Sequence, residues 1–347
     1  MKLFRNKTEE LAKECRSLLY TIKSETDRIH LCEDLLNRLN ADLKTSMAYQ
    51  QLSLLATHKG KTLKDISKDV FVSYPKATGF LRDVQNCNLL LLSDFKKFCD
   101  GNNIKFWLHA GTLIGALRNN GFIQWDDDAD VAMTRDDFNI MRKKIQDSSL
   151  LELNEYYNDI TCSRQYQLKY KQKDIPVFID VVMYDTCLAV RSADDALFWT
   201  QYRSLRQELV NNFREKIGNT PLIDIGYYHV GLYPPDVKKK VDELIDTANQ
   251  KICPESIPLS EKPSFFYAME NYPFTYPIMK YDDLFPLKEI PFEGMSFLIP
   301  ANPEQYLLGY GNIWLPPEDM GKTPHLYAFQ NSSDAIKKFL NERNGND

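Results

Sequence analysis

Residues 104–134, IKFWLHAGTLIGALRNNGFIQWDDDADVAMT, carry the most informative pattern in the chain. The apolar run at 104–108 predicts a short buried strand. A short helix is expected at 113–118, with Thr112 as its N-cap. Residues 122–134 then return as extended chain, so the pattern predicts a strand, a helix and a second strand in direct succession.

Four aspartates lie within five positions of this segment, at 126, 127, 128 and 130. In a strand, the side chains of Asp126, Asp128 and Asp130 would share one face, with Cα atoms about 6.6 Å apart at each step. Carboxylates that are buried together without a partner destabilise a fold. A divalent cation removes this cost, and hard oxygen ligands suit Mg²⁺ or Mn²⁺. A solvated acidic turn is the alternative for this stretch taken alone.

A later apolar run, residues 178–183, contains one acid, Asp180. An aspartate inside a buried strand is costly unless it is paired or binds a metal. Asp180 is therefore a candidate metal ligand, or the base that takes a proton from an attacking hydroxyl. A buried carboxylate that accepts backbone N–H groups is the alternative.

The turn and helix at 110–118 could hold an anion. Gly111 lets a ligand approach the backbone closely, and the first N–H groups of a helix can face a phosphate. Arg118 could add a bidentate phosphate contact, although an exposed cation at a helix end is equally common. The order of a Gly-Thr turn, an Asp-x-Asp motif and a later aspartate is the order that metal-assisted phosphoryl or nucleotidyl transfer requires.

Residues 108–118, 121–130 and 178–181 resemble the LicD-type phosphotransferases, a group that includes fukutin-like proteins, and the likeness extends over roughly residues 81–327. The resemblance implies a nucleotidyltransferase-like fold. It also implies Mg²⁺-dependent transfer of a phosphorylated group, such as phosphocholine or a polyol phosphate. The donor would be CDP-linked, and the acceptor a sugar hydroxyl of a surface glycan or glycolipid.

The resemblance assigns roles to the acids. Asp128 and Asp130 match the paired metal ligands of the family, and Asp126 matches an adjacent ligand. Asp180 matches the carboxylate of a third strand. The implied catalytic set is therefore Asp128, Asp130 and Asp180, and the implied metal ligands are these three with Asp126.

The donor phosphates would be lined by Gly111, Thr112 and Arg118 in the same comparison. Lys169, one strand before Asp180, is a further candidate for a phosphate contact, and an exposed strand lysine is the alternative. His325 stands where the family often has a late histidine, which favours a place beside the substrate over a lone surface histidine.

We expect an α+β fold in which helices flank a mixed, nucleotidyltransferase-like sheet. A helical N-terminal extension is expected at 1–80 and the catalytic core at 81–190. A C-terminal substrate region with helices and a Pro/aromatic-rich tail is expected at 191–347. The seven-residue rhythm of apolar residues in 9–57 predicts a long amphipathic helix or helical pair. That helix could mediate self-association as a coiled coil, or pack on its own domain.

The finer pattern predicts a polar connector at 61–80. The other expected elements are helices at 81–100, 136–146, 193–217 and 237–251, and strands at 166–170 and 177–184.

The composition narrows the function classes. Lys and Arg total 43 against 48 Asp and Glu, and the net charge of -5 argues against nucleic-acid binding. No apolar run reaches the ~18 residues of a transmembrane helix, which leaves peripheral membrane association open. Seven cysteines without a C-x-x-C pair favour a reducing compartment. We therefore expect a cytoplasmic protein, with the inner face of the membrane as one location.

Two other functions remain open at this stage. One is a nucleotide-sugar glycosyltransferase that uses Asp128-x-Asp130 as its metal motif. The other is a noncatalytic, nucleotidyltransferase-like binding module.

Overall fold

A computed structural model describes residues 46–158, 163–187, 279–315, 323 and 325–344, together with short pieces and single residues between 204 and 267. The chain divides into two compact units. One comprises residues 1–67 and 314–320, and the other comprises residues 68–313 and 321–347. The larger unit contains the sheet and every predicted site residue. The domain boundaries expected from the sequence stay a prediction.

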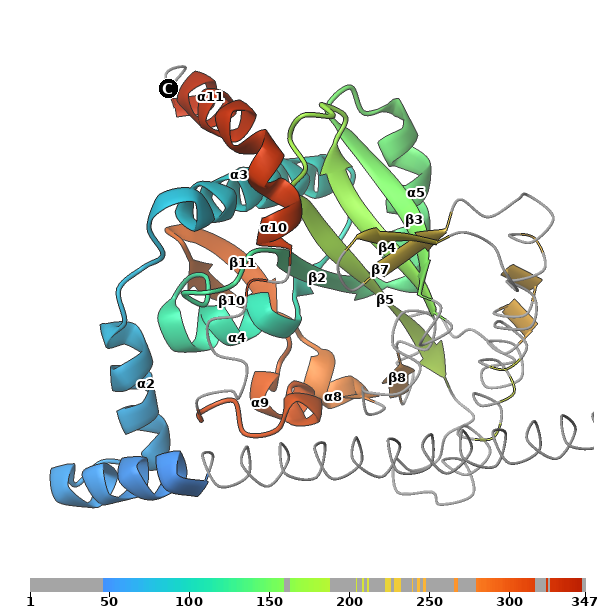
Figure 1. The fold of residues 1–347 in the computed structure, drawn as a ribbon. Coiled ribbons are helices and arrows are strands. Elements are labelled where there is room, and N and C mark those ends of the chain that lie inside the picture. The colour runs from blue at the N-terminus through green and yellow to red at the C-terminus, as the bar shows by residue number, and fades with distance from the viewer. Residues whose placement is uncertain are drawn as a thin grey trace, which may run out of the picture. The chain divides into compact units, whose positions relative to one another are not determined.

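A mixed sheet forms the centre of the larger unit (Figure 1). Its main strands are, in spatial order, β1 (Trp107–Leu108), β2 (Ala129–Thr134), β5 (Phe178–Cys187), β4 (Ser163–Tyr170) and β3 (Leu151–Asn158). β2 and β5 are parallel, whereas the β1–β2, β5–β4 and β4–β3 pairs are antiparallel. β8 (Phe265–Tyr267) extends the sheet beside the end of β5, followed by β9 (Met279–Lys280). The predicted α+β fold with a mixed sheet flanked by helices is confirmed.

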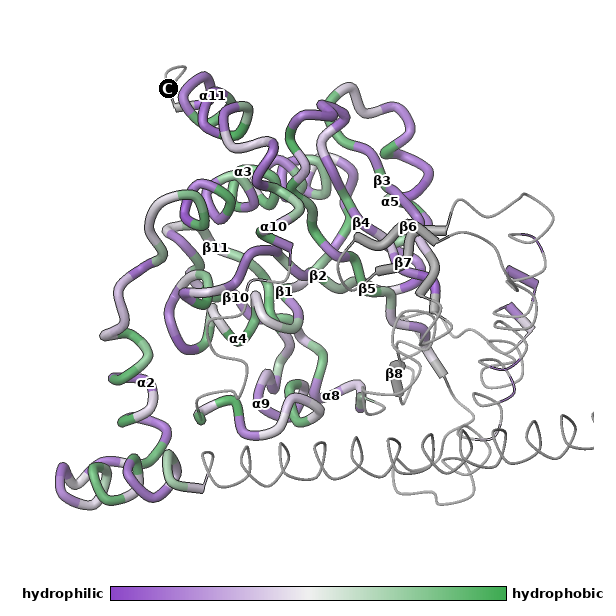
Figure 2. The backbone as a smooth tube through the Cα atoms, in the orientation of Figure 1, coloured by the Kyte–Doolittle hydropathy of each residue, from purple (hydrophilic) through white to green (hydrophobic). Residues whose placement is uncertain are grey.

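Three helices surround this sheet. α3 (Gly79–Gly101) contacts β5, α4 (Ala110–Asn119) contacts β2, and α5 (Arg135–Lys144) contacts both strands. Figure 2 shows hydrophobic and hydrophilic residues alternating along α3, as expected for a helix with one buried side. The helices at 81–100 and 136–146 were thus predicted at nearly the correct positions.

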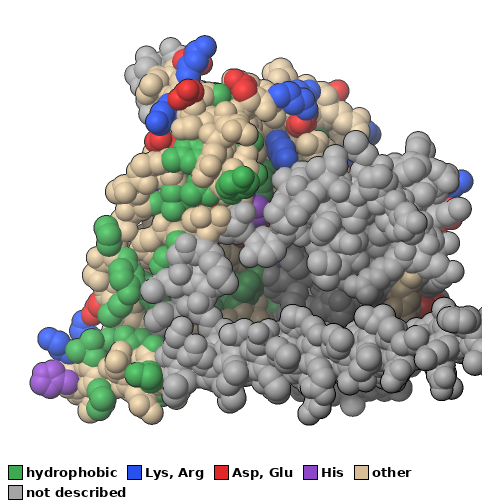
Figure 3. All heavy atoms as spheres, in the orientation of Figure 1, with side chains coloured by type: hydrophobic (Ala, Val, Ile, Leu, Met, Phe, Trp, Pro, Cys, Tyr) green, Lys and Arg blue, Asp and Glu red, His purple; other side chains and the backbone are tan. Residues whose placement is uncertain are grey.

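The C-terminal helix α11 (Ser333–Asn344) lies across α3 (Figure 1). Asp94 of α3 accepts hydrogen bonds from Arg343 at 2.6 Å and from the Tyr170 hydroxyl at 3.0 Å. This buried carboxylate therefore ties α11 to both α3 and β4. Figure 3 shows positive and negative side chains interspersed around this end of the molecule.

The remaining described elements are short. They are β6 (Leu222–Ile225), β7 (Tyr228–Gly231), α8 (Tyr281–Leu284), β10 (Lys288–Phe292), β11 (Met295–Ile299), α9 (Pro303–Tyr306) and α10 (Leu326–Phe329), with 3-10 turns at Ile145–Asp147, Leu308–Tyr310 and Gln330–Ser332. β10 and β11 form an antiparallel hairpin whose turn is Glu293-Gly294. No helix in the described ranges is long and apolar enough to cross a membrane.

One expectation about local structure was wrong, and one strand was missed. The connector expected at 61–80 contains the helix α2 (Leu63–Ser73), which buries Ile66 at 4% and Phe71 at 1% exposure. β3 was not expected, since its sequence LELNEYYN is mostly polar. Residues 46–59 are helical, in agreement with a helical N-terminal arm. The rest of the heptad pattern and most of the helices expected at 193–217 and 237–251 lie outside the described residues.

Candidate active site

The acidic segment lies on a loop that leads into β2. Because β2 begins at Ala129, Asp126 and Asp128 precede the strand and only Asp130 lies on it. The expectation that strand alternation places Asp126, Asp128 and Asp130 on one face was therefore wrong. The loop's own path, set by tertiary contacts, brings its carboxylates to Asp130.

Three carboxylates from two strands and this loop meet at one point. Asp130 and Asp180 are Cα partners on the parallel strands β2 and β5, so their side chains leave the same face of the sheet. Asp128, Asp130 and Asp180 each offer an oxygen, and these oxygens lie within 4.8 Å of one another. Asp130 is 8% exposed and Asp180 is 4% exposed. This geometry can hold a cation through oxygen ligands alone, the donor set that Mg²⁺ and Mn²⁺ prefer.

The carboxylates of the cluster disfavour ionisation of one another. Burial, followed by the charges of Asp128 and Asp180, raises the pKa of Asp130 well above its usual value. Burial likewise raises the pKa of Asp126, and Asp128 beside it adds to the effect. Positive charge placed among these groups would remove both penalties, so the residues fit a divalent cation. Asp126 lies outside the three-carboxylate set, and its role as a ligand stays a prediction.

Asp127 has a role that the sequence analysis missed. Its Oδ2 accepts the backbone N–H groups of His325 and Leu326 at 2.7 and 2.6 Å. Its Oδ1 lies 3.2 Å from Nδ1 of His325. No sequence signal separates Asp127 from the acids on either side of it, because its partners follow about two hundred residues later. Asp127 fixes α10 against the acidic loop.

This contact brings His325 to the carboxylates. Its Nδ1 lies 3.5 Å from Oδ2 of Asp128, so His325, Asp127 and Asp128 form a second group able to hold a metal. Burial disfavours the imidazolium, but the hydrogen bond to Asp127 and the charge of Asp128 outweigh burial and raise the pKa of His325. His325 is 6% exposed, which contradicts the surface alternative.

Gly111 and Thr112 lie in the first turn of α4, where they contact two of the aspartates, Asp126 and Asp130. The N-cap of α4 is His109, so the expectation that Thr112 caps this helix was wrong. The Thr112 hydroxyl instead accepts the backbone N–H of Asp130 at 2.8 Å. A Cβ at Gly111 would lie 2.9 Å from Oδ2 of Asp126, so a larger residue would displace this carboxylate.

Arg118 is buried rather than exposed at a helix end. Its guanidinium lies 3.7 Å from the centre of the Phe71 ring, and its Nη1 donates to the carbonyl oxygen of Ile313 at 3.0 Å. Burial lowers the pKa of Arg118 to about 10, against the opposing charge of Asp126. Within the described residues, Nε and Nη2 have no hydrogen-bond partner. Contact with a phosphate stays a prediction.

Lys169 is partly buried on β4, opposite Phe178 of β5. Its Nζ lies 5.4 and 5.5 Å from the ring centres of Tyr156 and Phe178. Burial lowers the pKa of Lys169, although the charge of Asp180 opposes this shift. The structure therefore places Lys169 near the carboxylates, where the exposed alternative does not fit, and its contact with a phosphate stays a prediction.

Residues 103–216 match the family model described as "LicD/FKTN/FKRP, nucleotidyltransferase domain". The chain therefore contains a LicD-type domain. The match includes α4, the acidic loop and the three carboxylates, whereas His325 lies beyond it. The resemblance noted from the sequence is confirmed at the level of the family.

Individual relatives are similar over parts of their length. The lipopolysaccharide cholinephosphotransferase LicD of Haemophilus influenzae is 34% identical over 121 residues, which are 30% of this chain and 44% of that protein. An uncharacterized protein of Rickettsia prowazekii is 43% identical over 47 residues, or 14% of this chain and 18% of that protein. Mannosyltransferase regulator 4 of Saccharomyces cerevisiae is 24% identical over 323 residues, with 77% of this chain and 27% of that protein covered. The chain thus spans less than half the length of each of these relatives.

Proposed function

We propose that this protein is a metal-dependent phosphotransferase of glycan synthesis, for example of lipopolysaccharide or capsule. It would move phosphocholine or a polyol phosphate from a CDP-linked donor to a sugar hydroxyl of a glycan or glycolipid. The convergence of Asp128, Asp130 and Asp180 within a LicD-type domain is the observation that carries this proposal.

In this proposal, Asp128, Asp130 and Asp180 hold Mg²⁺ or Mn²⁺, with Asp126 beside them. A cation bound there supplies positive charge to the oxygens of the transferred phosphoryl group. Asp180 is 4% exposed and lies on β5, so it would need little reorganisation when the substrates bind.

The donor phosphates would face the first turn of α4, where Gly111 and Thr112 lie. The N–H groups of a helix N-terminus favour an anion. Lys169 and His325 both lie beside Phe178, and both side chains carry N–H groups that can bind a phosphate oxygen. Arg118 would contribute through Nε and Nη2.

We further propose a cytoplasmic location, at the inner face of the membrane where a glycolipid acceptor would be found. Cys87 and Cys99 are buried free thiols, and burial raises the pKa of Cys87 to about 12, which suits small core residues in a reducing compartment. Pairing of two chains through the N-terminal helix, and the absence of a nucleic-acid partner, belong to the same proposal.

The test is release of CMP from CDP-choline or a CDP-polyol in the presence of Mg²⁺ and a glycan acceptor. We expect CMP release by the natural chain and a fall of at least about 100-fold in Asp128→Asn. Asp100→Asn is the control, because the Asp100 side chain is 63% exposed and pairs only with Lys96 in the described structure. Full activity in Asp128→Asn would contradict the proposed metal site.

Other products would point to the alternatives. Release of UDP or GDP from nucleotide sugars would indicate a glycosyltransferase. The similarity that extends over 323 residues is to a yeast protein named as a regulator, which favours a noncatalytic module as the second candidate. That module would bind neither Mg²⁺ nor CDP derivatives, so neither would raise its thermal stability.

A further inference from the structure

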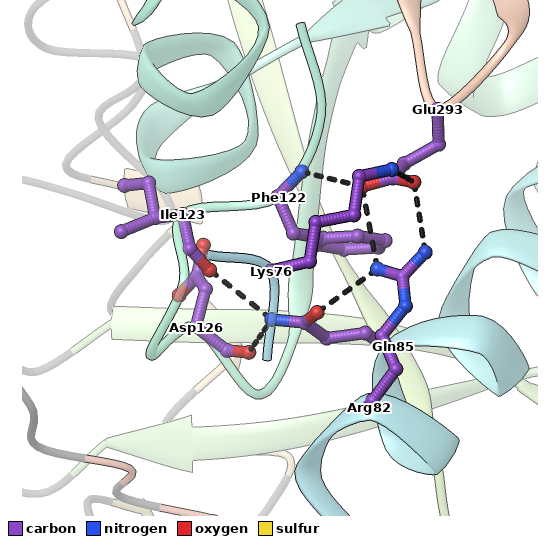
Figure 4. Close-up of polar contacts among 7 residues, drawn as sticks. All are labelled: Lys76, Arg82, Gln85, Phe122, Ile123, Asp126 and Glu293. Carbon is purple, nitrogen blue, oxygen red and sulfur yellow. Dashed lines mark hydrogen bonds and ion pairs between the residues drawn. The ribbon is translucent and has the colours of Figure 1, made fainter. Parts of the chain in front are cut away.

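A side chain of α3, that of Gln85, is hydrogen-bonded to the loop that carries the aspartates. Gln85 is 1% exposed, and its Nε2 donates to the carbonyl oxygen of Ile123 at 3.1 Å and to that of Asp126 at 2.9 Å (Figure 4). One amide thus binds two backbone carbonyls of the same loop. Because the Asp126 carbonyl points to α3, the path of the chain just before Asp128 is set by this contact.

Arg82, one turn earlier on α3, orients the Gln85 amide. Its Nη1 donates to Oε1 of Gln85 at 3.1 Å, which leaves Nε2 to face the loop (Figure 4). Its Nη2 donates to Oε2 of Glu293 at 2.9 Å. Arg82 therefore joins α3 to the turn of the β10–β11 hairpin, more than two hundred residues away in the sequence.

Glu293 forms hydrogen bonds with the other end of the loop. Its Oε1 accepts the backbone N–H of Phe122 at 3.3 Å, and its own backbone N–H donates to the carbonyl of Asn120 at 3.0 Å. Lys76 contacts its Oε2 at 2.6 Å. A Cβ at Gly121 would lie 2.3 Å from Oε1 of Glu293, so a larger residue there would displace this carboxylate.

The contacts form a closed ring: Glu293 binds Arg82, Arg82 binds Gln85, Gln85 binds the end of the loop, and Glu293 binds its beginning (Figure 4). Each member is buried or partly buried, which strengthens such hydrogen bonds and makes their loss costly. We propose that Arg82, Gln85 and Glu293, the clamp, are positioning residues that set the metal affinity of the site by holding the acidic loop in its binding geometry.

Repulsion between the carboxylates is the physical reason why the clamp would affect metal affinity. Without a cation, the carboxylates at 126, 128 and 130 repel one another, so a loop tied only to β2 and, through Asp127, to α10 would move to separate them. The clamp opposes that movement, so less reorganisation is needed when the cation binds. Substitutions of groups that orient metal ligands typically weaken metal affinity by about 10- to 100-fold.

The test uses Mn²⁺ as the probe and measures its dissociation constant by spin resonance, with the metal-free melting temperature alongside. Gln85→Met keeps the size of the side chain and removes both donated hydrogen bonds. Asn102→Leu is the matched control, since Asn102 also donates one amide bond to a backbone carbonyl, that of Phe98 at the far end of α3. We expect Gln85→Met to weaken Mn²⁺ binding about 10-fold or more, and Asn102→Leu to leave it unchanged.

A second variant covers the case in which Gln85→Met does not fold. Glu293→Gln keeps an acceptor for Phe122 and loses the charge that holds Arg82, so we expect a smaller loss of Mn²⁺ affinity in the same direction. Activity at saturating Mn²⁺ should recover in either folded variant, because excess metal compensates for a misplaced loop. Dissociation constants within about two-fold of the natural chain in the folded variants would overturn the proposal.

The proposed role of the clamp rests on the proposed metal site, and the Mn²⁺ titration tests the two proposals separately. No Mn²⁺ binding by the natural chain, or undiminished binding by Asp128→Asn, would overturn both proposals. Binding by the natural chain that is lost in Asp128→Asn but kept in Gln85→Met would overturn the role of the clamp alone.

Discussion

Asp130 and Asp180 stand side by side on parallel strands, directly paired in register although fifty residues separate them in the chain. Their side chains leave the same face and meet Asp128 there. The sheet therefore brings like charges together, an arrangement that weakens the metal-free fold and suits a bound cation.

Asp180→Asn should stabilise the metal-free protein and abolish activity. The amide keeps the shape of the carboxylate and removes one of the repelling charges, so the melting temperature without metal should rise by roughly 2–5 °C. Phosphotransfer should fall by about 100-fold or more. Calorimetry in the presence of a chelator and a CMP-release assay measure the two effects, and a lower melting temperature would show that Asp180 stabilises the apo fold.

Asp127→Asn should loosen α10 from the acidic loop. The Asp127 side chain is fully buried and receives two backbone N–H groups and the imidazole of His325. An amide has one acceptor oxygen, so we expect a loss of about 2–3 kcal/mol in the free energy of unfolding. Urea denaturation measures this loss. The exposed Asp147, changed to Asn in the same way, should give a value near zero.

Gly115→Ala should be strongly destabilising, whereas Gly101→Ala should be tolerated. A Cβ at Gly115 would lie 2.4 Å from the carbonyl oxygen of Gly121, a backbone atom that cannot turn away. Nothing lies within 4 Å of the corresponding position at Gly101. We expect a loss of about 3 kcal/mol for the first variant and less than about 1 kcal/mol for the second, measured by urea denaturation. Equal values for the two would contradict the packing of α4 on the loop.

The clamp should contribute to acid stability. Burial opposes ionisation of Glu293, but hydrogen bonds from Arg82 and Lys76 outweigh burial and hold its pKa below the ordinary value of 4.5. A depressed folded-state pKa stabilises the fold above the unfolded value, and this contribution disappears as the pH falls through the folded value. The stability difference between the natural chain and Glu293→Gln should thus be constant from pH 7 to about 5.5 and shrink below pH 4.5. A difference that grows on acidification would contradict this assignment.

The local sequence pattern was enough to predict the helices and strands next to the site. The helices at 81–100 and 136–146 and the strands around Asp130 and Asp180 follow from apolar spacing and from glycine and asparagine stops, which act within a few residues. The same pattern failed at β3, whose polar sequence is held by pairing with β4. It also failed at α2, whose few buried side chains include Ile66 and Phe71.

The residue types of the site were determined by the sequence, because three acids among apolar neighbours are costly wherever the chain places them. Their geometry was decided by tertiary structure alone. Asp127 takes its partners from 198 residues away, and Phe122 takes its acceptor from 171 residues away. Such contacts depend on which strands pair and which helix covers them, and no local pattern contains that information.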